Sequence, residues 1–251
     1  MKTAAERKEE PCLRVVYQDS DLLVVNKPAD LVCHPTKGDV YSSLISRVRL
    51  HAGPEMQPQL VNRLDRETSG ITLVALNSQA ARELRRIWEL RQVEKTYLAI
   101  VHGHVASDSG RIEAALGRDE RSKVAIKDCV RADGASAQTD YRTLRRFARE
   151  AGADRRMMEF SLLQVQPCTG RKHQIRIHMA HIGHPVVGDK IYGGDEDAYL
   201  ALVERRLTPE QRQRLILPCQ ALHSSQLRFS WRGREWTFDA EPEDWFAAFC
   251  S

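Results

Sequence analysis

The sequence contains no long apolar run, no paired cysteines and no low-complexity linker. No stretch approaches the roughly 20 consecutive apolar residues that a membrane helix needs. The charged start, MKTAAERKEEP, has no apolar run behind it and is not a secretory signal. The six cysteines stand singly, which argues against zinc ribbons and a disulfide framework. We therefore expect a reduced, cytoplasmic protein without a membrane segment.

A recognised metal-binding motif is also missing. His173, His178, His181 and His184 lie close together in the sequence and raise the possibility of a zinc site. However, no HExxH pattern or cysteine pair accompanies them, so we expect no metal.

The composition is that of a globular, soluble chain. With 251 residues, 42% hydrophobic and 29% charged, the chain can build one large or two small domains. The net charge is only +4, but basic residues gather in two regions, Arg82–Lys95 and Arg142–Arg156. Such clusters suit a phosphate backbone, although solvated surface is the more common explanation for either one alone.

Periodicity predicts more strands than helices. We expect strands over residues 13–18, 22–26, 71–76, 94–103, 136–147, 157–166, 220–229 and 234–239. Helices are expected over 41–51, after Asn77–Ser78, over 171–183, and at the end of the chain. Because strands often follow one another directly, the pattern favours an α+β fold with a mixed, mainly antiparallel sheet flanked by helices. We predict a disordered tail over 1–12 and a single domain over 13–251, with 196–216 as a peripheral helical insertion.

The segment NRLDRETSG (62–70) is the most unusual in the chain. Asp65 stands between Arg63 and Arg66, just before a buried strand. Nearby positive charge favours the ionised carboxylate, so Asp65 is a candidate reactive group. For an arbitrary aspartate, pairing with an arginine or capping a turn would be the more common role.

A second basic segment, TGRKHQIRIHMAHIGHPVVGDKIYG (169–193), follows a strand and opens a helix. As a helix it would bury Ile175, Met179 and Ile182, and would leave Arg176 and Lys172 on another side.

Four blocks in this order resemble the RluA family of RNA pseudouridine synthases. They are LLVVNKPADLVCHP (22–35), NRLDRETSGITLVA (62–75), EKTYLAIVHG (94–103) and GRKHQIRIHMAHIGHPVVGDKIYG (170–193). A terminal block, QALHSSQLRF (220–229), also fits, so the resemblance spans roughly residues 13–240. The family usually has His where this chain has Asn62, which affects the expected loop geometry or substrate preference rather than the activity.

The resemblance implies that Asp65 is the catalytic aspartate, that Tyr97 packs against the target base and that Arg176 pairs with Asp65. It also implies that Arg63 helps to fill the space of the displaced nucleotide. We expect further RNA contacts from Arg171 and Lys172 of the second basic segment, and from Arg145 and Arg146 of the Arg142–Arg156 region. Lys27–Pro28 ends a strand, and its expected role is structural.

The implied reaction isomerises a uridine of structured RNA to pseudouridine after the base has been flipped out. It is redox-neutral, so we expect no cofactor. A noncatalytic RNA-binding module and a nucleoside or sugar hydrolase are the alternatives, and a hydrolase normally uses a second carboxylate. Only about a dozen residues precede the first predicted strand, so we expect no S4-type domain. A monomer acting on tRNA or ribosomal RNA is the resulting prediction.

Overall fold

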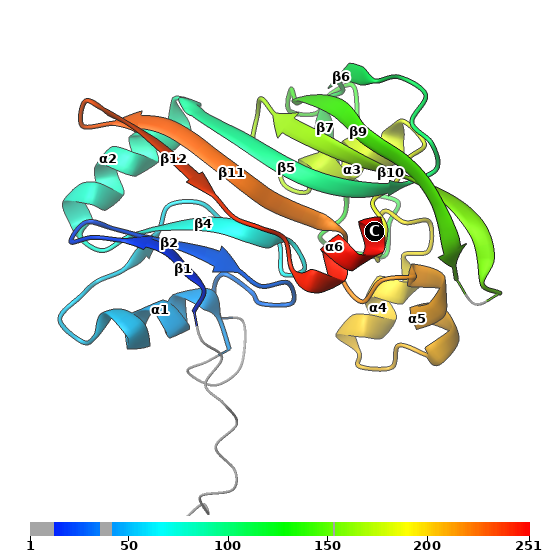
Figure 1. The fold of residues 1–251 in the computed structure, drawn as a ribbon, viewed down its shortest axis with the longest axis horizontal. Helices are drawn as coiled ribbons and strands as arrows, with labels where there is room; N and C mark the ends of the chain where they lie inside the picture. The colour runs from blue at the N-terminus through cyan, green and yellow to red at the C-terminus, as the bar shows by residue number, and fades with distance from the viewer. Residues whose placement is uncertain (1–12, 36–41, 153) are drawn as a thin grey trace, which may run out of the picture.

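The computed structural model describes residues 13–35, 42–152 and 154–251, and the predicted tail lies outside these ranges. Within them, ten strands form one sheet, ordered β1-β2-β4-β11-β5-β10-β9-β6, with β3 beside β4 and β12 beside β11 (Figure 1). The strands of this sheet are β1 (Val15–Gln18), β2 (Leu22–Lys27), β3 (Gln59–Leu60), β4 (Ser69–Ala75), β5 (Val93–His102), β6 (Ser109–Glu113), β9 (Gln138–Ala151), β10 (Arg156–Pro167), β11 (Leu222–Trp231) and β12 (Arg234–Asp239). The strands expected from periodicity are all present.

The sheet is mixed and mainly antiparallel, as predicted. Its parallel pairing joins β4 to β11, where Gly70 lies opposite Ser224. A Cβ atom at position 70 would stand 2.3 Å from the Ser224 carbonyl oxygen, and the φ angle of Gly70 is +113°. Both facts require glycine here. The last residue of the NRLDRETSG segment therefore allows two strands distant in sequence to meet.

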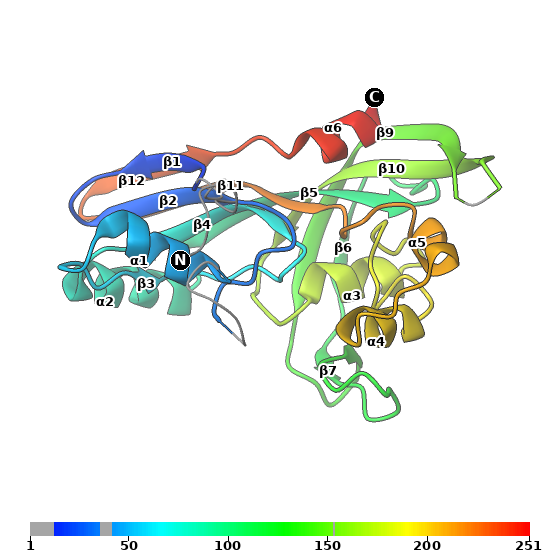
Figure 2. The same cartoon turned by 90° about the horizontal axis from the view of Figure 1, so that it is seen from below.

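Of the six helices within the described residues, five lie on one side of the sheet and the sixth lies on the other (Figure 2). They are α1 (Leu44–Ala52), α2 (Ser78–Glu89), α3 (Gln174–His181), α4 (Asp197–Val203), α5 (Pro209–Leu215) and, opposite them, α6 (Asp244–Cys250). Asn77 caps α2 by accepting a hydrogen bond from the Ala80 N–H at 2.9 Å, as its position predicted. Among the described residues, no helix is long and apolar enough to cross a membrane.

The charged stretch 196–216 forms two short helices, α4 and α5, with Thr208 capping the second one. One part of the chain differs from the sequence expectation. Residues 104–135, for which periodicity predicted no element, contain β6 and the separate hairpin of β7 (Leu116–Arg118) and β8 (Asp128–Val130). The strands of this hairpin have three residues each, too few to show an alternating pattern.

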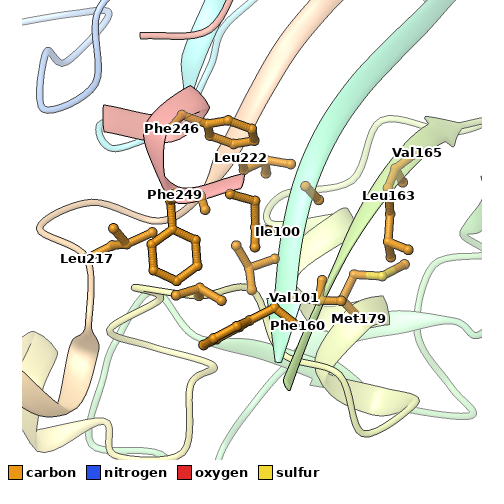
Figure 3. Close-up of a cluster of buried hydrophobic side chains, with 14 of the residues drawn as sticks. Ile100, Val101, Phe160, Leu163, Val165, Met179, Leu217, Leu222, Phe246 and Phe249 are labelled. Carbon is orange, nitrogen blue, oxygen red and sulfur yellow. The ribbon is translucent and has the colours of Figure 1, made fainter. Parts of the chain in front are cut away.

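The largest buried apolar cluster lies around β5 and β10 (Figure 3). Phe160 of β10 is fully buried, and its ring centroid lies 5.0 Å from that of Phe249 in α6. Met179 of α3 and Ile100 of β5 belong to the same cluster. This packing fixes α3 and β5 relative to each other, and these two elements carry much of the site described next.

Candidate active site

Asp65 lies in the loop that joins β3 to β4, and Asn62 braces this loop against β4. The Asn62 side chain accepts a hydrogen bond from the Leu73 N–H at 2.7 Å and donates one to the Ile71 carbonyl at 3.3 Å. The residue that departs from the family pattern thus has a local structural role.

Lys27 holds the other side of the same loop from the interior of the protein. Its ammonium group is fully buried and donates to three backbone carbonyls, those of Pro28, Leu31 and Arg66, at 2.8 to 3.0 Å. Burial lowers the pKa of Lys27 to about 8. With its donors turned inward, this lysine has the structural role that its place at the end of a strand suggested.

Arg176 of α3 is a buried cation shared by two carboxylates. Its Nε and Nη2 atoms donate to Asp189 at 2.6 and 2.8 Å, and Nη1 donates to Asp65 Oδ2 at 2.8 Å. Asp189 also accepts the backbone N–H groups of Ile191 and Tyr192. Burial opposes the charge of Arg176, but the two carboxylates outweigh it and raise the pKa of the guanidinium. The helical pattern was wrong to place Arg176 away from the buried face, because the residue is only 5% exposed.

Asp65 is held ionised, and one of its oxygens has no hydrogen-bond partner among the described residues. Burial alone would raise the pKa of this carboxyl, but the charge of Arg176 outweighs that effect and the net pKa is lowered. Oδ2 is taken by Arg176, whereas Oδ1 lies 3.9 Å from His173 Nε2, beyond hydrogen-bond distance. The Asp65 side chain keeps 32% of its surface exposed. A reactant can therefore reach this side chain.

His173 is a neutral neighbour of that oxygen. It adopts a left-handed conformation with φ of +54°, just before α3 begins. Its Nδ1 atom lies 2.9 Å from the Tyr192 hydroxyl, and that hydroxyl accepts the Asp128 N–H at 3.2 Å. The Tyr192 hydroxyl can therefore donate its hydrogen bond to Nδ1. The N–H of His173 then lies on Nε2, which faces Asp65. Burial lowers the pKa of His173 to about 4.

A pocket of about 630 Å³ opens in front of Asp65. Among the described residues, its lining contains one carboxylate, that of Asp65, and six cationic side chains: Arg63, Arg66, Lys95, Arg171, Lys172 and Arg176. This excess of positive charge attracts anions, and phosphate groups of a polynucleotide are the anions that fit several cations spread over one surface.

Tyr97 lines the same pocket from β5, opposite Ser224 of β11 and Val165 of β10. Burial raises the pKa of its phenol to about 12, and the charge of Asp65 acts in the same direction. The phenol is therefore protonated at neutral pH, so the ring offers an uncharged flat face.

Three of the predicted RNA-binding residues, Arg63, Arg171 and Lys172, also line the pocket. Arg171 donates to the Ser136 carbonyl at 3.2 Å, and Lys172 pairs with Asp128 at 2.9 Å. Among the described residues, Arg63 has no hydrogen-bond or ion-pair partner.

Arg145 and Arg146 lie on β9, outside the pocket lining. Arg145 donates to the Cys250 carbonyl at the end of α6, and Arg146 donates to the Val105 carbonyl and to Asp108. The structure thus separates these two arginines from the other predicted site residues, and RNA contact by them remains a prediction.

The four histidines of the zinc interpretation are dispersed. His178 bonds with Thr139 and the Ala114 carbonyl, and His184 with the His102 carbonyl, whereas His173 faces Asp65. The described residues hold no cluster of three or more potential metal ligands.

Sequence reasoning missed the residues that hold this site together. Asp189 anchors Arg176, and the next residue, Lys190, forms a buried pair with Glu67 at 2.8 Å. Glu67 lies in NRLDRETSG, and Asp189 and Lys190 lie in the GDKIYG part of the second block. The opposite charges in these two blocks could have indicated the pairing, because the structure brings the two blocks into contact.

The sequence matches the RNA pseudouridylate synthase family over residues 21–181. It is 37% identical, over 72% of its length, to an uncharacterized RNA pseudouridine synthase of Bacillus subtilis, of which it covers 58%. It is 34% identical, over 92% of its length, to the ribosomal large subunit pseudouridine synthase D of Zymomonas mobilis, of which it covers 70%. The chain thus spans little more than half the length of some of the relatives that it matches.

The fold is also similar to a solved human structure, RNA pseudouridylate synthase domain containing 1. The TM-score is 0.72 at 28% identity, and the match covers 94% of this chain and 86% of the human one.

Proposed function

The chain belongs to the RNA pseudouridylate synthase family, and on that premise we propose that it isomerises a uridine in structured RNA to pseudouridine, with Asp65 as the catalytic aspartate. The observation that carries this proposal is the state of Asp65. One oxygen is fixed by Arg176, and within the described residues the other has no hydrogen-bond partner and the remaining charged side chains of the pocket lining are cationic.

The reaction breaks the bond between N1 and C1′, turns the uracil over and joins C5 to C1′. The C5 proton is lost and N1 gains one, so the step needs no oxidant and no added group. Asp65 Oδ1 can attack the sugar, attack the base, or remove a proton on a glycal route. Because uracil leaves as a delocalised anion, a second acidic residue of the kind used by hydrolytic glycosidases is not required.

The target nucleotide has to leave its stack before C1′ can reach Asp65. Unstacking costs a few kcal/mol, and stacking of the displaced base on Tyr97 returns about 1–3 kcal/mol. Arg63 has no bond to the described protein and stands two residues from Asp65, so it is available to occupy the vacated space in the RNA. Arg171 and Lys172 would contact the backbone beside it.

Ribosomal RNA is the first substrate class to test, because relatives of this chain are named for the large ribosomal subunit. Transfer RNA is the second. Sequence-specific recognition of RNA uses splayed bases in loops and bulges, so a stem-loop with the target uridine should be modified nearly as well as the whole RNA. Modification of the intact RNA alone would mean that recognition spans a larger surface.

The proposal also includes action as a monomer, in the cytoplasm and without a metal ion. The five cysteines within the described residues are free, which suits a reducing compartment. A constant mass in solution across protein concentrations would support the monomer. Turnover that survives a chelator would support action without a metal ion.

Incubation of the protein with bulk cellular RNA tests the function against its alternatives. Pseudouridine in the RNA is the expected product. Release of free uracil would indicate a hydrolase instead, and RNA binding with neither product would indicate a noncatalytic module. The Asp65→Asn protein, prepared identically, controls for contaminating synthases.

A further inference from the structure

The pocket extends past Tyr97 along β5 to a part that the proposed reaction does not use. Lys95 and Tyr97 are two residues apart on one strand and therefore point to the same side of the sheet. Trp88, in the last turn of α2, lines the pocket beyond Lys95. Figure 1 shows α2 beside the end of β5 that is farther from α3.

The indole of Trp88 is held by a neighbouring ring, but part of its surface and its N–H group are not used by the described protein. Its ring packs edge-on against Phe229, with centroids 5.5 Å apart, and Phe229 pairs with Val93 at the start of β5. Trp88 is only partly buried. Its Nε1–H group has no acceptor within the ranges that the structure describes. This group is not fully buried.

Lys95 has no carboxylate partner among the described residues. Its one hydrogen bond is a long one, 3.3 Å, to the Thr169 carbonyl. Partial burial lowers its pKa, since the charged ammonium has lost water without gaining a counter-ion. A bound anion would supply the missing charge.

The kinds of side chain in this part of the pocket are those that bind single-stranded nucleic acid. Tyr97 and Val93, the strand partner of Phe229, are four residues apart on β5, which is about 13 Å, and Lys95 lies midway. An aromatic ring, a cation and a second aromatic ring along one groove is the arrangement with which proteins bind successive unpaired nucleotides.

We propose that Trp88 and Lys95 form a binding subsite for a second unpaired nucleotide of the substrate RNA, whose base stacks on Trp88 while Lys95 binds the phosphate between it and the target uridine. The subsite rests on the proposed function for the identity of the target position. It would make the enzyme select uridines with an unpaired neighbour on one side.

A binding experiment with altered RNA tests the subsite. The probe is a short RNA hairpin whose loop carries one uridine among cytidines, together with a set in which one loop cytidine at a time is abasic. Full-length protein carrying Asp65→Asn, which should not turn the RNA over, is compared with the same protein carrying Trp88→Ala in addition. Loss of the stacked base should weaken binding to the first protein roughly tenfold at one loop position. The Trp88→Ala protein should bind the intact hairpin as weakly and should be insensitive to the abasic change at that position.

Three further variants separate stacking, charge and folding. Trp88→Phe should recover most of the affinity because it retains a flat ring. Lys95→Met should lower the slope of log affinity against log salt by about one, and Trp88→Ala should leave that slope unchanged. Trp245→Ala, in α6 on the other side of the sheet, is the matched control and should bind the whole set of hairpins as the parent does.

Independent, additive effects of Trp88→Ala and of every abasic substitution would overturn the subsite. The outcome is separable from that of the proposed function. If wild-type protein forms pseudouridine in bulk RNA while no loop position couples to Trp88, the function stands and the subsite is wrong. If no pseudouridine forms, the function fails, and the coupling is still read from binding alone.

Discussion

Arg176 lies between Asp65 and Asp189 and binds the two carboxylates with different numbers of hydrogen bonds. Asp189 receives two bonds from Arg176 and is fully buried, whereas Asp65 receives one from Arg176 and its side chain is partly exposed at the pocket. The buried carboxylate fixes the guanidinium plane, and the guanidinium in turn orients the reactive carboxylate. Asp189 is therefore a positioning residue, although it does not face the pocket.

The Asp189→Asn variant tests this arrangement. Removing the Asp189 charge leaves the buried guanidinium of Arg176 with Asp65 as its one remaining carboxylate partner among the described residues, so the free energy of unfolding should fall by up to about 3–5 kcal/mol. Asp140→Asn is the matched control, because the Arg111–Asp140 pair is partly exposed and should contribute no more than about 1 kcal/mol. Urea unfolding measures both changes. Equal stability losses in the two variants would contradict the account.

Tyr97 should act through its ring and not through its hydroxyl. Its raised pKa leaves no phenolate at neutral pH, so Tyr97→Phe should preserve RNA binding and most of the turnover. Tyr97→Ala should weaken the complex in which the base is flipped out by about 1–3 kcal/mol, through the lost stacking. Single-turnover kinetics on a modified RNA compare the two. A loss in Tyr97→Phe as large as in Tyr97→Ala would assign the function to the hydroxyl.

His173 should make the stability of the protein depend on pH below neutrality. Burial lowers its pKa to about 4 in the folded protein, from 6.5 when exposed. As the pH falls through this window, the unfolded chain takes up a proton that the folded chain does not, so the free energy of unfolding decreases. The contribution of His173 is at most about 3 kcal/mol.

Replacement of His173 isolates that contribution from those of the other buried histidines. Urea unfolding at the two ends of the window should show a smaller pH-dependent loss of stability in His173→Gln than in the wild type. The same pH dependence in both proteins would mean that the folded protein does not lower the pKa of His173.

The fold could be predicted from the sequence where the signal was local. Alternating apolar residues predicted β5 and β10, and Asn77 marked the start of α2. The parallel pairing of β4 with β11 left no local pattern, because it depends on Gly70 meeting a strand about 150 residues later. The burial of Arg176 was hidden for the same reason: its partner Asp65 is 111 residues away, and a helical pattern shows only which side chains are apolar.

The residues of the candidate site also fall into those that could be predicted from the sequence and those that could not. The resemblance named Asp65, Tyr97, Arg63 and Arg176, and the structure places all four at one pocket. It gave no role to Asp189, which acts only through Arg176. For Arg145, charge alone suggested RNA, yet its guanidinium donates to a carbonyl at the end of α6, where a cation is favoured by the helix dipole. A cluster of like charges in sequence does not indicate what each charge contacts.

The most direct test of the central claim compares pseudouridine formation by the wild type and by Asp65→Asn on the same RNA. Asparagine retains an acceptor for Arg176 Nη1, so the variant should fold and bind RNA nearly as the wild type does. It lacks the negative charge that Asp65 brings to the pocket, so it should form no detectable pseudouridine. Turnover within about tenfold of the wild type would contradict the assignment of Asp65 as the catalytic group.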